Sequence, residues 1–88
     1  MLADGRMPGM ATTQDISRLR TLSGREVEVL WLQLMVEHHR GGVLMAQAAT
    51  ELVEAPYERR LATSIVESQT AEIRYLTELL AARGAAAP

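Results

Sequence analysis

Apolar residues recur at intervals of three and four along most of the chain, which is the spacing that one face of an α-helix requires. The pattern has one short segment and two long ones, and it predicts helices over residues 13–22, 24–53 and 56–83. They follow an arm at residues 1–11, where Pro and Gly between two methionines interrupt regular structure. We therefore expect one all-α domain over residues 1–88.

Residues that favour helix ends stand where the periodic segments stop. Ser23 and Glu26 have the spacing of a capping box, in which a hydroxyl and a carboxylate each accept from a free backbone N–H. Pro56 suits the first turn of a helix and disrupts the interior of one, so it divides the two long helices. Arg83 and Gly84 supply a cation in the last turn and a residue suited to end the helix. The short connection makes the two long helices an antiparallel hairpin.

Each long helix carries an apolar stripe that its hairpin partner cannot cover alone. A leading helix of about ten residues is too short to cover the remainder. A second copy of the chain would complete a four-helix bundle with a two-fold interface, and the other hairpin of a longer parent chain would do the same. The predicted stripes are Val27, Trp31, Leu34, Met35, His38, Gly42, Met45, Ala49 and Leu52 on the second helix, and Leu61, Ala62, Ile65, Gln69, Glu72, Ile73, Leu76, Leu79 and Leu80 on the third.

Composition agrees with a helical domain and excludes several functional classes. The chain has 88 residues, 48% of them hydrophobic, with one Trp, two Tyr and no Phe, so it is poor in strand-forming residues. Nine basic and eleven acidic residues give a formal net charge of −2, and we expect no binding to nucleic acid. No apolar run is long enough to insert across a membrane. The absence of Cys excludes disulfides, zinc–thiolate sites and thiol catalysis.

Four polar residues lie within the predicted stripes, near the middle of the hairpin. A connection centred near Ala55 sets His38 level with Glu72, while His39 lies toward the edge of its stripe and Gln69 lies on the facing stripe. A buried imidazole or carboxylate without a partner is energetically costly. We therefore expect at least a hydrogen bond between His38 and Glu72.

This polar layer has two interpretations. In the first it is structural and fixes the register of the bundle, so that the domain is a dimerisation or interaction module. In the second it binds a metal, because imidazole, carboxylate and thioether groups lie within one or two helical turns and thioethers favour Cu(I). The candidate metal ligands are His38, His39, Met35, Met45 and Glu72, together with Met7 and Met10 in the arm.

We do not expect an enzyme. Di-iron carboxylate bundles need a Glu-x-x-His motif on two helices, but Glu72 is followed three residues later by Tyr75, and Glu37 by Arg40. The hydroxyl groups of the third helix have no base and orienting group that the sequence places beside them, and a nucleophile needs both. The sequence therefore favours a non-enzymatic protein.

Several motifs resemble one protein family. They are Met7-Pro8-Gly9-Met10, Leu22-Ser23-Gly24, the stretch over residues 35–46 that contains His38-His39, and the stretch over residues 65–73 that contains Gln69 and Glu72. Together they resemble domain-of-unknown-function family 305 over about residues 7–80. Gly42 departs from that family, which often has Ala after the two histidines.

The resemblance implies a ferritin-like fold, and some bacterial members, the CopM-like proteins, bind copper outside the cytoplasm. Many members carry two hairpins, and the Met-Pro-Gly-Met arm usually introduces the second, so the chain resembles a C-terminal half. We therefore expect a ferritin-like four-helix bundle completed by dimerisation or by the rest of a longer chain. The expected function is copper binding or metal handling, with a periplasmic or secreted location, although the chain contains no signal peptide.

Overall fold

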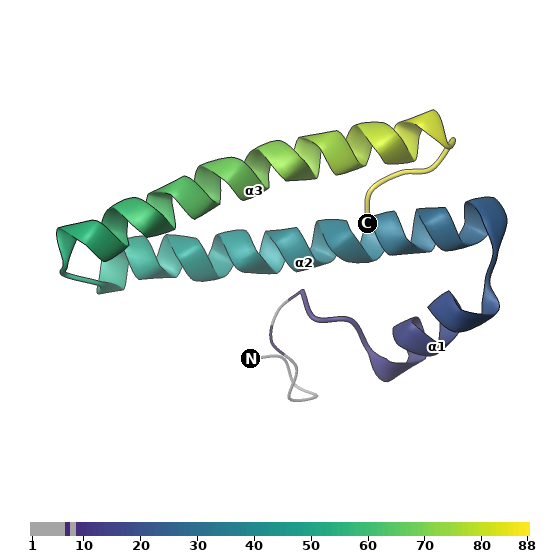
Figure 1. Cartoon of the computed structure of the whole chain (residues 1–88), viewed down its shortest axis with the longest axis horizontal. Helices are drawn as coiled ribbons and strands as arrows, with labels where there is room; N and C mark the ends of the chain where they lie inside the picture. The colour runs from purple at the N-terminus through teal and green to yellow at the C-terminus, as the bar shows by residue number, and fades with distance from the viewer. Residues whose placement is uncertain (1–6, 8) are drawn as a thin grey trace.

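The computed structural model describes residues 7 and 9–88, and this part of the chain is all-α, as predicted (Figure 1). It contains the helices α1 (Thr13–Thr21), α2 (Gly24–Leu52) and α3 (Pro56–Ala82), and no strand. Each helix begins at the expected residue and ends one residue before the expected end. Residues 1–6 and 8 of the predicted arm lie outside the described residues.

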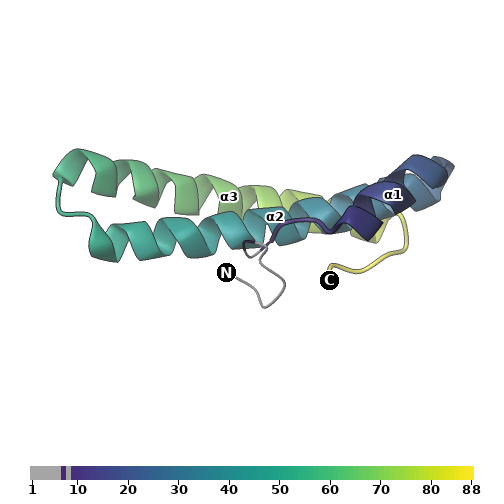
Figure 2. The ribbon, with the colours of Figure 1, turned by 90° about the horizontal axis from the view of Figure 1, so that it is seen from below.

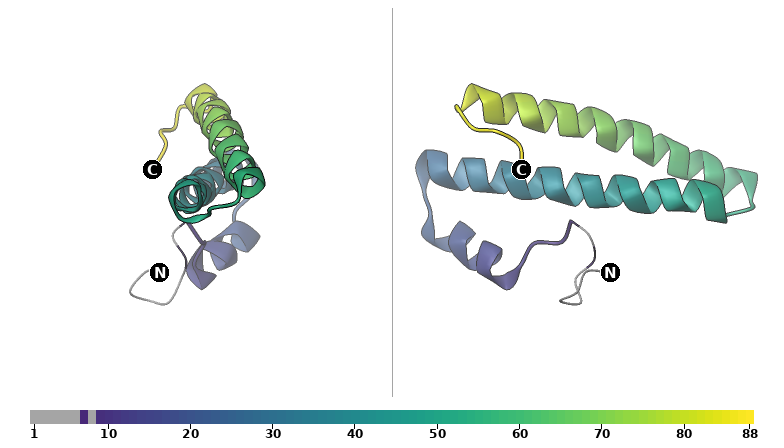
Figure 3. Two further views of the ribbon diagram at one scale, coloured as in Figure 1. Left: turned by 90° about the vertical axis from the view of Figure 1, so that its left-hand side faces the viewer. Right: turned by 180° about the vertical axis from the view of Figure 1, so that it is seen from behind.

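The two long helices form an antiparallel hairpin. α2 and α3 run side by side along the longest dimension of the molecule (Figures 1 and 3). α1 folds back along α2 near the open end of the hairpin and packs against α2 (Figure 2). The Cα atoms extend over 46 × 30 × 16 Å, which is the shape of a hairpin. No helix in the described part of the chain is long and apolar enough to cross a membrane.

The starts of α1 and α2 differ in their capping. Thr12 Oγ1 accepts from the Asp15 N–H at 2.9 Å and the Asp15 carboxylate accepts from the Thr12 N–H at 3.0 Å, which is a complete capping box. The capping box predicted at Ser23 and Glu26 does not form, because the Ser23 side chain makes no cap hydrogen bond. Gly24 has a φ of +58°, so the backbone after Ser23 does not take the right-handed turn that the box requires.

The hydrophobic core lies at the open end of the hairpin, where α2 begins and α3 ends. It consists of Leu32, Val36, Leu76 and Leu80. After α3 the chain reverses at Gly84, which has a φ of +71°, and the C-terminal segment returns toward α2 (Figure 1). Ala85 and Ala87 of this segment pack against the core. The C-terminal segment therefore covers part of the core.

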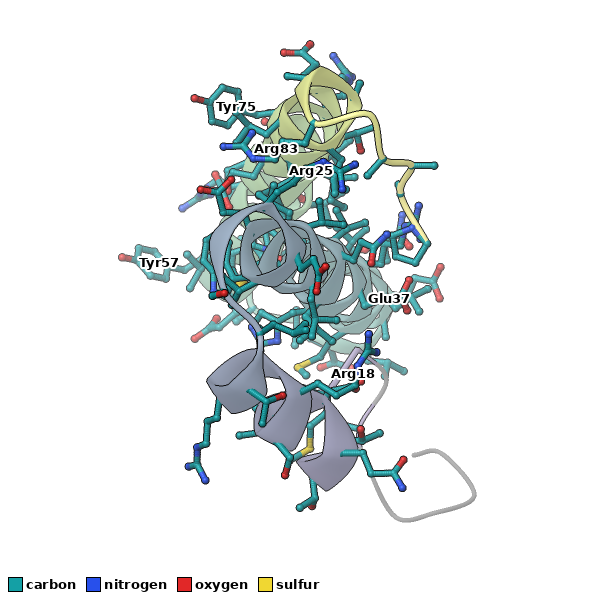
Figure 4. All side chains as sticks on the ribbon, turned by 90° about the vertical axis from the view of Figure 1, so that its right-hand side faces the viewer. Arg18, Arg25, Glu37, Tyr57, Tyr75 and Arg83 are labelled. Carbon is teal, nitrogen blue, oxygen red and sulfur yellow. The ribbon has the colours of Figure 1, made fainter. Side chains whose placement is uncertain are left out.

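Polar contacts fasten the same end. The Arg25 guanidinium donates to the Arg83 carbonyl oxygen, with a distance of 2.8 Å from Nε, and Arg83 Nε donates to the Glu28 carboxylate at 2.9 Å. Figure 4 shows Arg25 and Arg83 close together at this end. Gln33 Nε2 donates to the Ala86 carbonyl oxygen at 3.1 Å. These bonds join the start of α2 to the end of α3 and to the C-terminal segment.

The stripe predicted on α2 is only partly the face that packs against α3. Two of its members, Trp31 and Met45, are exposed. Two others keep the expected side, since Met35 packs against the core and Gly42 lies against Gln69 of α3. α2 carries two apolar stripes that are one residue apart, and one residue corresponds to a rotation of about 100°. Periodicity alone does not decide which stripe faces α3, so the prediction was wrong by one position at several residues. The residues of α2 that are buried are Leu30, Leu32, Val36, His39, Gly41 and Ala46.

Candidate functional site

Two adjacent histidines on α2 have opposite surroundings. His39 is buried against α3, whereas His38 is exposed. Their rings meet edge to face, with centroids 6.1 Å apart. The sequence predicted the reverse, with His38 on the core face and His39 toward its edge. The one-position rotation of α2 accounts for the exchange.

His39 is held between two hydrogen-bond acceptors. Its Nδ1 lies 2.7 Å from the Met35 carbonyl oxygen, and its Nε2 lies 2.5 Å from Glu72 Oε2. A carbonyl oxygen can only accept, so Nδ1 carries a proton, and the contact at Nε2 needs a second proton on the ring or on the carboxyl group. The predicted hydrogen bond between His38 and Glu72 is therefore wrong, because Glu72 pairs with His39.

His39 and Glu72 connect α2 to α3, and the Met35 carbonyl oxygen holds the His39 ring within α2. Both ring nitrogens of His39 are engaged within the protein. A separation of 2.5 Å between Nε2 and Oε2 leaves no room for an intervening ion, since each metal–ligand bond is itself about 2 Å long. The Met35 side chain packs against the core at the open end. Each of these three predicted ligands thus makes a contact within the protein.

A groove of about 630 Å³ lies in the other half of the hairpin, toward the connection between α2 and α3. In this half the small side chains of Ala46 and Ala62 are the buried apolar contacts between the helices. Because alanines fill so little volume, space remains beside them. The groove is lined by Met7, Met10, His38, Gly41, Gly42, Met45, Ala46, Ala49, Val53, Glu58, Leu61, Ala62, Ile65 and Gln69.

The groove brings together the other four predicted ligands. His38 and Met45 come from α2, and Met7 and Met10 come from the arm that precedes α1. No hydrogen bond to the His38 ring is formed by any residue that the structure describes. One imidazole and three thioethers therefore line a single space that is open to solvent.

The arm reaches the groove through a tight turn. The Met10 N–H donates to the Met7 carbonyl oxygen at 3.1 Å, and Gly9 has a φ of +85°. Glycine readily adopts this φ, which is unfavourable for residues with a side chain. Gly9 lies directly on α2, since a Cβ placed on it would be 3.1 Å from the Cα of Gly41. The turn thus brings Gly9 into contact with α2 beside the groove.

One wall of the groove depends on a pair that the sequence did not single out. A Cβ placed on Gly42 would lie 2.5 Å from Oε1 and 2.9 Å from Nε2 of Gln69. Gly42 therefore leaves room for the Gln69 amide to lie across α2. The sequence signal was the glycine itself, because glycine weakens a helix interior and allows another group to approach the backbone closely.

The donors at the groove fit a soft ion better than a hard one. Among the residues that the structure describes, Glu58 is the single carboxylate in its lining. Within residues 7 and 9–88 no cluster of three or more His, Asp or Glu side chains could hold a metal ion. Mg²⁺ and Ca²⁺ prefer several oxygen ligands, which this lining does not offer. Thioether sulfur and imidazole nitrogen suit Cu(I).

Comparison with known proteins identifies relatives of the whole hairpin. Residues 1–80 match the family model of a domain of unknown function, DUF305. The crystal structure of a "putative secreted protein DUF305" from Streptomyces coelicolor is similar to this chain, with 52% sequence identity and a TM-score of 0.87. The match covers 93% of this chain and 51% of that one, so this chain spans about half the length of that protein. No curated protein matches the chain.

Proposed function

This chain belongs to the DUF305 family, and from that premise we propose that its groove binds a soft metal ion, Cu(I), outside the cytoplasm. The proposed ligands are His38 and Met45 of α2 and Met7 and Met10 of the arm. The ion is cargo that the protein holds or hands on, and no reaction is assigned to the site.

One observation carries the proposal, and it is the gathering of thioethers at the groove. Of the four methionines in the described part of the chain, three line this one space together with His38. Methionine often serves only to fill a core. Met45 cannot have that role in the hairpin, because it is 61% exposed. A solvent-facing set of thioethers beside an imidazole is a donor set that soft metals prefer.

The test is a titration of the full chain with Cu(I) in competition with a chromogenic Cu(I) chelator, under anaerobic conditions. Replacing Met7, Met10 and Met45 together with Leu conserves volume and apolarity, so the fold should survive. Loss of a residue that merely supports a metal ligand lowers affinity by about 10- to 100-fold, and loss of three ligands should lower it further.

Met35→Leu is the matched control for these substitutions. Met35 packs against the core and does not line the groove, so its replacement should leave the Cu(I) affinity unchanged. Equal affinities of the wild type and the triple variant would contradict the proposal. Acid should release the copper that depends on His38, because a protonated imidazole cannot bind a metal, whereas thioethers do not titrate.

The extracytoplasmic location rests on the resemblance alone. The Streptomyces coelicolor relative carries the word secreted in its name. Fractionation of expressing cells would test this part of the proposal, with copper-binding chain expected outside the cytoplasmic fraction.

The alternative function is a structural dimerisation module, and one observation favours it. Large apolar side chains remain exposed on the hairpin, among them Trp31, which is 49% exposed, and Leu61, which is 55% exposed. Tyr57 and Tyr75 also project outward from the hairpin (Figure 4). Such surfaces commonly mark interaction sites. Sedimentation equilibrium should then give twice the monomer mass of 9.7 kDa, and a monomer at micromolar concentration would contradict pairing.

A further inference from the structure

The arm and the helix are in unusually close contact where they cross. A Cβ placed on Gly9 would collide with the Glu37 carbonyl oxygen and lie 3.1 Å from the Gly41 Cα. Gly41 is itself buried. The arm backbone therefore rests on the helix backbone, with no side chain between Gly9 and α2. Any residue other than glycine at position 9 would have to lift the arm away.

This crossing lies beside the proposed ligands. Glu37 and Gly41 bracket His38 on α2, so the arm crosses the helix at the level of the histidine. The turn closed between Met7 and Met10 sets their Cα atoms within about 7 Å of each other. Both side chains then line the groove that His38 lines.

We propose that Gly9 is the positioning residue of the metal site: its contact with α2 docks the arm and places both arm thioethers before any ion arrives. The inference rests on the proposed function and adds how the site is assembled. A site whose ligands are already in place does not have to order a free arm when the metal binds, and so it keeps more of the binding free energy. In this respect Gly9 acts through Met7 and Met10 and is not itself a ligand.

A second glycine provides a matched control. Gly24 also has a positive φ, +58°, so alanine at either position meets the same kind of backbone strain. A Cβ on Gly24, however, has no neighbour within 4 Å. Gly24 stands at the start of α2 and does not line the groove. Differences between Gly9→Ala and Gly24→Ala therefore report the contact with α2.

The experiment combines two measurements on the full chain. The first is the methyl NMR spectrum of labelled methionines without metal, in which docked Met7 and Met10 should have shifts distinct from free methionine. The second is the Cu(I) competition titration. Gly9→Ala should move both methyl signals to the free position and lower Cu(I) affinity by about 10- to 100-fold, the usual cost of losing a residue that orients metal ligands. Gly24→Ala should change neither quantity.

A third variant separates docking from ligation. In Met7→Leu with Met10→Leu the arm keeps Gly9, so the contact with α2 remains while both thioethers are lost. With the methyl groups of both introduced leucines labelled, this variant should still show a docked arm, with Cu(I) affinity lowered at least as far as in Gly9→Ala. Helical circular dichroism should be unchanged in both arm variants, because Met7, Gly9 and Met10 lie outside all three helices.

The outcomes distinguish this inference from the proposed function. Cu(I) binding by the wild type with an equal affinity in Gly9→Ala would overturn the inference alone. The inference would also be overturned if the methyl groups of Met7 and Met10 in the metal-free wild type had the chemical shifts of free methionine. The arm would then dock only with metal. A wild type that binds no Cu(I) would overturn the proposed function, and the positioning role would fall with it.

Discussion

The two ends of the hairpin use the same pair of helices but pack them differently. At the open end, leucine and valine side chains fill the interface, and the C-terminal segment covers them. At the connected end, the buried apolar contacts between the helices are Ala46 and Ala62, and a groove remains beside them. Large side chains at one end supply hydrophobic stabilisation, whereas small ones at the other end leave accessible space. One hairpin thus has a packed region and a grooved region along its length.

The adjacent histidines mark the boundary between these two regions. His39 faces the packed interface and bonds Glu72 of α3 and the Met35 carbonyl. His38, one position earlier, lines the groove. A difference of one residue rotates the side chain by about 100° around the helix. The same residue type therefore holds helices together at one position and is available as a ligand at the next.

The largest expected effect comes from removing the core at the open end. Leu80 is fully buried, so Leu80→Ala should lower the free energy of unfolding by about 2 to 5 kcal/mol in urea denaturation. Leu61→Ala is the matched substitution in the groove half, where the side chain is largely exposed, and it should cost about 1 kcal/mol or less. Similar losses at both positions would remove the distinction between the two ends.

The next largest effect is a difference in the free energy of unfolding between variants of the two histidines. His39→Ala removes the hydrogen bonds to Glu72 and to the Met35 carbonyl, and we expect a loss of about 1 to 3 kcal/mol. His38→Ala should change the free energy of unfolding by about 0.5 kcal/mol or less, because the ring is exposed. Urea denaturation of both variants checks this, and a larger loss for His38→Ala would restore the pairing first expected from the sequence.

A smaller effect tests the pairing directly. A double-mutant cycle between His39 and Glu72 should give a coupling free energy of about 1 kcal/mol, a modest value because the carboxylate is 60% exposed. The same cycle between His38 and Glu72 should give a coupling close to zero. If the second cycle gave the larger coupling, the assignment of His39 as the partner of Glu72 would be wrong.

Much of the fold could be predicted because helices and their ends are local features. The three- and four-residue spacing and Pro56 were enough to place all three helices. The capping box at Ser23 failed because the backbone conformation of Gly24 is not evident from the residue type. The prediction of which face of α2 packs against α3 was partly wrong because α2 has two apolar stripes one residue apart. Which of the two is buried depends on the contact with α3.

The arrangement of the candidate ligands could not be predicted from the sequence, and their role as metal ligands stays a prediction. Seven candidates were named from residue type and spacing, and in the structure three make contacts within the protein while four line the groove. The different surroundings of His38 and His39 follow from the rotation of α2. The approach of the arm could not be predicted either, because it depends on a contact between Gly9 and α2 that no periodic pattern encodes.

The most direct test of the account is the Cu(I) affinity of the two histidine variants, measured by chelator competition at a temperature where both are folded. We expect His38→Ala to lower the affinity by more than about tenfold and His39→Ala to leave it within about twofold of the wild type, because only His38 lines the groove. The assignment of the groove as a metal site would be contradicted if the Cu(I) affinity depended on His39 instead of His38. It would also be contradicted if neither the wild type nor either variant bound Cu(I).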